Sequence, residues 1–147
     1  MSDFIRIKKV WEDVGFIQVL IECQSSCINI NNKYYIDNET IKALISGIKN
    51  FLFDNKAYFL WQSGEIGNST AACISFEFTY RDKNGHILID VFMEIDDGSS
   101  YEKHNCCFFI NTEFGLLEQF SIHLHKILDG EIGTSVFLGS ANQSGDG

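Results

Sequence analysis

The stretch Ile74–Ile95 reads Ile-Ser-Phe-Glu-Phe-Thr-Tyr-Arg-Asp-Lys-Asn-Gly-His-Ile-Leu-Ile-Asp-Val-Phe-Met-Glu-Ile, and it decides the predicted fold. Apolar and polar residues alternate on both sides of Asn84-Gly85, as expected for strands whose side chains point to opposite faces in turn. Asn-Gly between two such runs is a strong hairpin signal, because both residues tolerate the positive φ of a two-residue type I′ turn. We therefore predict a hairpin with Asn84 and Gly85 as its turn.

This turn fixes the register of the predicted hairpin and places its apolar residues on one face. The predicted apolar pairs are Tyr80–Ile89, Phe78–Val91, Phe76–Met93 and Ile74–Ile95. The predicted pairs of the other face are Thr79–Asp90, Glu77–Phe92 and Ser75–Glu94. The hairpin is therefore predicted to form the middle of an antiparallel sheet that buries one face.

The rest of the chain is predicted to form five further strands and two helices. Alternating or β-rich runs predict strands over residues 4–10, 16–23, 27–36, 58–61 and 104–111. Apolar residues at spacings of three and four predict a helix capped by Asp37 or Asn38, and a second helix capped by Thr112. The order β-β-β-α-β-β-β-β-α predicts an α+β fold with a single antiparallel sheet of about six to seven strands and two helices on one face.

Length and composition predict one domain and exclude several partners. Residues 1–138 are expected to form a single domain, and residues 139–147, which lack a large apolar residue, a disordered tail. The net charge of −9, from 20 acidic and 11 basic residues, argues against nucleic acid as a partner. The chain shows neither a signal peptide nor an apolar stretch of membrane-spanning length, so we expect a cytoplasmic protein without membrane contact.

The cysteines and histidines are not arranged as a catalytic or metal-binding set. Cys23-x-x-x-Cys27 lies across a strand turn, and the adjacent cysteines of the run 104–107 point to opposite faces of a strand. His123 and His125 are two positions apart on a helix and do not face each other. We predict no catalytic residue, no metal, no cofactor and no disulfide.

Acidic residues of the central hairpin are the candidate binding residues. Glu77, Asp90 and Glu94 share its predicted polar face, and Asp96 and Asp97 extend the negative charge into the next turn. Carboxylates placed close together repel one another unless basic residues lie beside them. The simpler alternative is a solvated sheet face without a binding role.

Several features of the segment from Phe16 to Leu128 occur together in one known family. They are an early hairpin that leads into an Ile/Leu-patterned helix, an aromatic strand, a long hairpin with the turn Asp82-Lys-Asn-Gly85-His86, and a strand that runs into a final helix. The chain resembles the small bacterial proteins grouped with WapI-type immunity proteins, and related bacterial domains of unknown function that share the Asp-x-x-Gly-His turn. The resemblance implies a protein that protects a cell from a toxin, without catalytic residues of its own.

We therefore expect a non-enzymatic cytoplasmic protein of the immunity type, which binds and neutralises a cognate bacterial toxin domain. Its acidic balance fits a basic nuclease domain as the target, because complementary charge speeds association. The alternative is a small-molecule-binding or regulatory domain with a ligand in a cleft between helices and sheet. The sequence makes no prediction of the oligomeric state.

Overall fold

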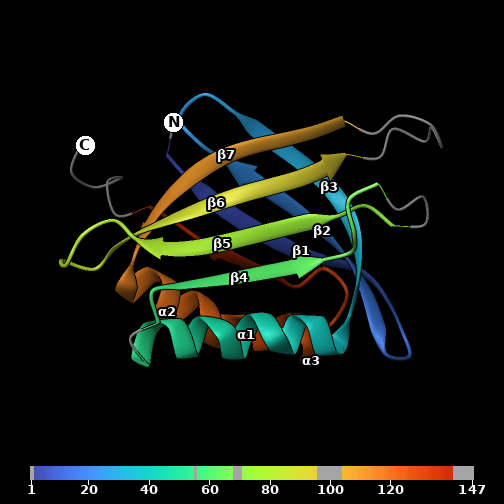
Figure 1. The fold of residues 1–147 in the computed structure, drawn as a ribbon. Coiled ribbons are helices and arrows are strands. Elements are labelled where there is room, and N and C mark those ends of the chain that lie inside the picture. Colours follow the sequence, from blue (N-terminus) through green and yellow to red (C-terminus); the bar gives the residue numbers. More distant parts are fainter. Residues whose placement is uncertain (1, 55, 68–70, 96–103, 141–147) are drawn as a thin grey trace.

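Two four-stranded antiparallel sheets and three helices form the described part of the chain, residues 2–54, 56–67, 71–95 and 104–140 of a computed structural model (Figure 1). Sheet A has the order β3-β2-β1-β8. Its strands are β1 (Phe4–Asp13), β2 (Phe16–Gln24), β3 (Asn29–Asp37) and β8 (Ser135–Leu138). Sheet B has the order β4-β5-β6-β7. Its strands are β4 (Tyr58–Ser63), β5 (Ile74–Tyr80), β6 (His86–Ile95) and β7 (His104–Glu113).

The α+β class and the antiparallel pairing are confirmed, but the prediction of a single sheet is wrong. Helix α1 (Asn38–Phe53) leaves the outer strand β3 of sheet A and leads to the outer strand β4 of sheet B. The helices α2 (Phe114–His123) and α3 (His125–Asp129) lead back from β7 to β8, at the opposite border of sheet A. Each helical connection therefore changes sheet. The alternation of the strands is the same in one sheet or in two, so it could not reveal this division.

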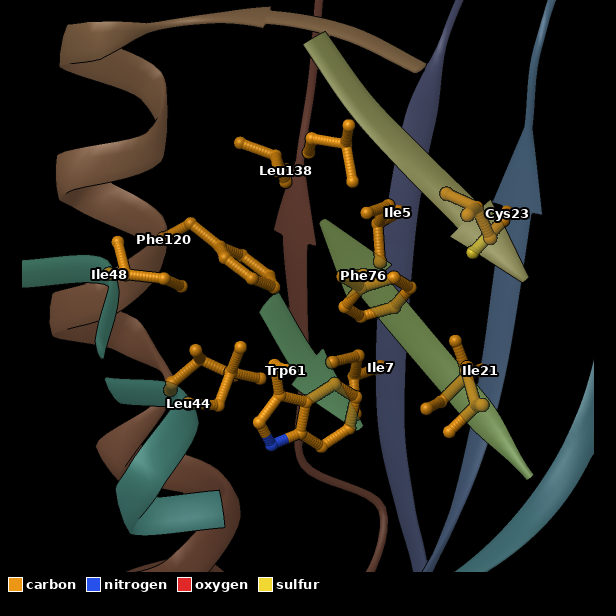
Figure 2. Packing of buried hydrophobic residues seen from close by; sticks show 14 of the residues in the cluster. Ile5, Ile7, Ile21, Cys23, Leu44, Ile48, Trp61, Phe76, Phe120 and Leu138 are labelled. Carbon is orange, nitrogen blue, oxygen red and sulfur yellow. The ribbon is translucent and has the colours of Figure 1, made fainter. Parts of the chain in front are cut away.

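The core lies between the inner faces of the two sheets, with the helices along one side (Figures 1 and 2). Ile7 and Ile21 of sheet A lie opposite Trp61 and Phe76 of sheet B, and Leu44 of α1 packs beside them (Figure 2). All five side chains are buried. Both sheets therefore bury one face and expose the other.

Helix α1 follows its prediction closely. Asp37 is the N-cap, and its Oδ1 accepts the Thr40 N–H at 2.7 Å, which satisfies a free donor of the first turn. The side chains of its apolar stripe are buried: Ile41, Leu44, Ile45, Ile48, Phe51 and Leu52. A Cβ atom at Gly47 would lie 2.0 Å from Cζ of Phe59 in β4, so the glycine lets this aromatic ring approach the helix.

The predicted faces of the central hairpin are correct, but its turn and register are wrong. The loop contains four residues, 82–85, because Arg81 N–H donates to the His86 carbonyl at 2.9 Å. Phe78 therefore pairs with Ile89 and not Val91, and Phe76 pairs with Val91 and not Met93. The remaining pairs shift in the same way: Tyr80–Ile87, Ile74–Met93, Thr79–Leu88, Glu77–Asp90 and Ser75–Phe92. A shift of two residues keeps every side chain on its face, so the alternation could not detect it.

The Asp82 side chain explains the longer loop. Its Oδ1 accepts the N–H groups of Asn84 at 2.8 Å and His86 at 3.3 Å, and its Oδ2 lies 2.6 Å from His86 Nδ1. Gly85 has a φ of +88°, the left-handed conformation that glycine adopts without strain. The Asp82 side chain thus stabilises the four-residue loop in place of the two-residue turn that Asn84-Gly85 favours.

The predicted C-terminal helix differs from the structure at its start and in its middle. Thr112 is not its cap, because the residue lies in β7 and its Oγ1 donates to the Gly139 carbonyl at 2.9 Å. Glu113 occupies the cap position without a side-chain hydrogen bond. The helix is divided at Leu124 into α2 and α3. Its predicted apolar stripe, Leu117, Phe120, Leu124 and Ile127, is buried.

A buried lysine from β1 binds the end of α3. Lys9 is 0% exposed, and its Nζ donates to the carbonyls of Gly130 at 3.0 Å and Leu128 at 3.3 Å. The same ammonium lies 2.8 Å from Oε2 of Glu12. A cation at this position satisfies free carbonyls of the last turn and opposes the helix dipole. Lys9 lies at an irregularity of the β1–β2 ladder, between Lys9 and Trp11.

The segment that follows α3 returns to sheet A as β8, which pairs with β1 from Ile5–Leu138 to Lys8–Ser135. Gly139 and Ser140 belong to the described chain, and Ser140 is buried. The rest of the predicted disordered tail, residues 141–147, lies outside the described residues. Among the helices within the described ranges, none is long and apolar enough to cross a membrane.

Candidate protein-binding face

The outer face of sheet B carries two acidic residues in direct opposition. Glu77 of β5 pairs with Asp90 of β6 in the observed register, whereas the predicted register separated them. Leu60 of β4 lies beside Glu77, and Phe109 of β7 lies beside Asp90. Because paired residues of neighbouring strands share a face, these four side chains form one row across the sheet. We call this row, Leu60–Glu77–Asp90–Phe109, the acidic row.

Neither carboxylate of the acidic row forms an ion pair with another residue in the described part of the chain. The ion pairs found there join Arg6 to Glu22, Lys9 to Glu12 and Lys42 to Glu39, and His86 Nδ1 contacts Asp82. Like charges directly opposite each other on a sheet are destabilising by roughly 0.2–1 kcal/mol. The pair therefore works against folding, and a cation from another molecule would relieve it.

Exposed apolar side chains flank the carboxylates. Leu60 is 52% exposed and Phe109 is 53% exposed, and Tyr58, in the next row beside Thr79, is also exposed. Asp90 is exposed and Glu77 is partly buried. Single exposed apolar side chains are common on protein surfaces, so it is their position beside two carboxylates without an ion pair that makes this row the candidate.

Glu94 is buried, so the prediction that it projects from this face into solvent is wrong. The side chain is 2% exposed. Its Oε2 accepts the Gly67 N–H at 3.0 Å and its Oε1 accepts the Cys73 N–H at 3.0 Å, so backbone groups of these two residues lie against the carboxylate. Its backbone carbonyl accepts the Tyr34 hydroxyl at 3.0 Å, which links sheet B to sheet A. Glu94 is thus a structural residue.

The other predicted binding residues lie in two groups. Glu77 and Asp90 are brought together, more closely than the sequence predicted. Asp96 and Asp97 lie outside the described residues. The exposed apolar members of the row, Leu60 and Phe109, were not singled out from the sequence. The alternation of β4 and β7 places both side chains on the outer face. That they lie beside Glu77 and Asp90 could be inferred only from the order of the strands in the sheet.

The five cysteines are free thiols; Cys106 and Cys107 are adjacent in β7, and the others lie in β2 and in two loops. Cys23 and Cys73 are buried, and burial raises the pKa of both thiols. A nearby acidic residue, Glu22 for Cys23 and Glu94 for Cys73, raises each pKa further. Such thiols stay protonated and are poor nucleophiles. In the described ranges, no group of three or more His, Cys, Asp or Glu residues is placed to hold a metal ion.

An aromatic cluster lies on the opposite side of the molecule. Trp11, Phe16 and Tyr35 project from the outer face of sheet A, with ring centroids 5.4–6.3 Å apart. Because these rings contact one another, part of their apolar surface is already covered. In the acidic row the two exposed apolar side chains are separated by carboxylates, so they do not cover each other.

Among the described residues, an open hollow beside α3 is a further feature that suits a ligand. Its volume is about 340 Å³, near the lower end of the range for small-molecule sites. It is lined by His125, Lys126, Asp129, Gly130 and Thr134. It lies at the surface and not in a cleft between helices and sheet, where the sequence placed a ligand.

Comparisons of the chain with models of known families, with curated proteins and with solved structures gave no match.

Proposed function

We propose that this chain is a non-enzymatic interaction protein of the immunity type, which binds a basic toxin domain through the acidic row of sheet B. The observation that carries the proposal is the direct pairing of Glu77 with Asp90, neither of which forms an ion pair with another described residue. An arrangement that opposes folding is consistent with a role in binding. A lysine or arginine of the partner would remove the repulsion and form charge-assisted hydrogen bonds.

The apolar residues of the row give the second part of the proposed interface. Leu60 and Phe109 lie on the two outer strands, so a partner that reaches the carboxylates also covers both apolar side chains. Burial of apolar surface contributes roughly 25 cal/mol per Å². The net charge of −9 adds long-range attraction for a basic partner.

The test uses proteins encoded by genes beside this one as candidate partners. Each is purified and its association with the wild-type chain is measured over a range of salt concentrations. The double variant Glu77→Gln, Asp90→Asn should associate more slowly and with a weaker dependence on salt. The matched control Glu39→Gln, Asp54→Asn removes the same charge at the two ends of α1 and should behave as the wild type.

Two results would contradict the proposal. Binding of the double variant that equals that of the control would exclude the acidic row as the interface. Failure of every neighbouring gene product to bind the wild-type chain would argue against the immunity type of function.

A small-molecule-binding domain is the second candidate, and the hollow beside α3 is the observation that favours it. The side chains of His125, Lys126 and Asp129 in its lining are exposed. Ligand sites usually hold a few polar groups in a largely buried, apolar surrounding. We therefore favour the acidic row, and a ligand that raises the melting temperature of the wild type but not of a Thr134→Trp variant would reverse this preference.

A further inference from the structure

The outer edge of β7 presents backbone groups that can pair with another strand. Successive residues of an antiparallel strand direct their N–H and C=O groups alternately to its two sides. The Asn111 N–H donates to Oδ2 of Asp3 at 2.8 Å, so it points away from β6. Residues at alternate positions, Asn105, Cys107 and Phe109, therefore direct their backbone groups to the same open side.

This part of the edge has no strand beside it in the described chain. β7 forms the border of sheet B (Figure 1). Among the described residues, the hydrogen bonds outside the ladders include none to the backbones of Asn105, Cys107 and Phe109. Asp3 occupies only the Asn111 end of the strand. Unpaired groups in a row form a template on which a further strand can add.

The other outer strands are better protected against such addition. β8 has only four residues. β4 runs beside α1, where Trp61 Nε1 donates to the Thr40 carbonyl at 2.9 Å (Figure 1). β3 carries Lys33, and a lysine on an edge opposes strand pairing. β7 runs for ten residues in continuous register with β6, and its segment Asn105–Thr112 has no charged side chain.

We propose that β7 pairs antiparallel with β7 of a second copy of this chain, so that two B sheets form one continuous sheet across a two-fold axis. An antiparallel edge is self-complementary, because each donor of one copy meets an acceptor of the other. Two copies with a net charge of −9 repel each other over most of their surface. The uncharged segment of β7 is where they can meet with least repulsion.

The positions of the open groups select the register. Cys107 is the middle one of the three residues with open backbone groups, Asn105, Cys107 and Phe109. A two-fold axis that passes beside Cys107 gives each of these residues a partner in the second copy. Asn105 then lies opposite Phe109 of the partner subunit. The two Cys107 residues face each other with Cα atoms about 5.5 Å apart, as in a hydrogen-bonded antiparallel pair. The inference does not rest on the proposed function, because the partner of β7 leaves Glu77 and Asp90 accessible on the outer face.

The test compares the molar mass of three proteins by light scattering over a range of concentrations. The wild type should reach twice the 16.7 kDa of one chain as its concentration rises. Cys107→Pro should remain at 16.7 kDa, because proline lacks an N–H and the amide that it removes points to the open edge, not to β6. Cys107→Ser retains the N–H and should dimerise as the wild type does.

Hydrogen exchange of the wild type gives a second measurement that requires no substitution. The amides of Asn105, Cys107 and Phe109 should exchange rapidly in dilute solution and slowly in concentrated solution. A Cys27→Ser variant should also form a covalent dimer with a short bis-maleimide reagent through Cys107. A wild type that stays monomeric at every concentration would overturn the proposal. A dimer whose three amides remain unprotected, or which persists in folded Cys107→Pro, would overturn it as well.

Discussion

Replacement of Gly47 by alanine tests how closely α1 packs against sheet B. Alanine is better than glycine inside a helix by about 1 kcal/mol, so an unhindered position would be stabilised. At Gly47 the added Cβ would lie 2.0 Å from Cζ and 2.3 Å from Cε1 of Phe59. Carbon atoms in contact prefer about 3.5–4.0 Å, so the ring or the helix must move.

The expected loss of stability depends on how the Phe59 ring is packed, because this ring must move to accept the added Cβ. The Phe59 ring stacks on Phe78 with centroids 5.6 Å apart and an interplanar angle of 10°. Excess volume in a packed core costs roughly 1–3 kcal/mol, and a lost aromatic pair costs roughly 0.5–1.5 kcal/mol. After subtraction of the gain in helix propensity, we expect Gly47→Ala to lower the free energy of unfolding by roughly 0.5–3.5 kcal/mol. For a chain of this length, the melting temperature should fall by roughly 1–14 °C.

The assay is urea unfolding followed by circular dichroism, with two comparisons. Gly115→Ala changes a glycine of α2 that has no atom within 4 Å of the added Cβ, so it should be neutral or stabilising. In a Phe59→Leu background, the loss caused by Gly47→Ala should shrink, because the shorter side chain leaves room. A Gly47→Ala variant that is more stable than the wild type would refute the packing argument.

Three further substitutions test buried and loop contacts. Glu94→Gln should lower the free energy of unfolding by about 1–3 kcal/mol, because one buried N–H loses its acceptor, and a urea midpoint equal to that of the wild type would contradict this. Lys9→Met should cost about 1–3 kcal/mol in the same assay, since two helix carbonyls lose their donor, whereas Lys8→Met on the exposed face should change little. The hydrogen bond from His86 lowers the pKa of Asp82 below its ordinary 3.8, so this carboxylate stabilises the fold above pH 3.8 and the effect disappears as pH falls through the lowered pKa. The difference in melting temperature between the wild type and Asp82→Asn should therefore shrink on acidification, and a constant difference would exclude this linkage.

Local patterns in the sequence were sufficient for most elements of the fold. The Asp37 cap, the apolar stripe of α1 and the alternation of the strands each depend on neighbouring residues, and all were confirmed. The Phe78–Val91 register failed because a two-residue shift leaves the faces unchanged, and because the Asp82 side chain stabilises a longer loop. Local patterning determines which way a side chain points, but not which residue it meets.

The candidate site could be predicted only in part for the same reason. The sequence placed Glu77 and Asp90 on one face, and the structure shows that they are direct neighbours. Glu94 followed the same alternation, yet it is buried, and its carboxylate accepts the backbone N–H groups of Gly67 and Cys73, which are distant in sequence. Lys9 likewise alternates with its neighbours, and only the return of the chain through α3 and β8 explains its burial. The sequence did not predict the contacts between segments that are distant in the chain.

The pairing of β8 with β1 has a consequence for synthesis of the protein. Ile5 pairs with Leu138, so almost the whole described chain separates the two strands that complete sheet A. During translation, β1, β2 and β3 emerge before β8, so the edge of β1 that pairs with β8 stays unpaired until β8 has been synthesised. Domains with such distant contacts fold slowly, because a long loop must close before the contacts form. The exposed border of β1 is therefore a point at which a nascent chain can bind a chaperone or pair wrongly with another strand.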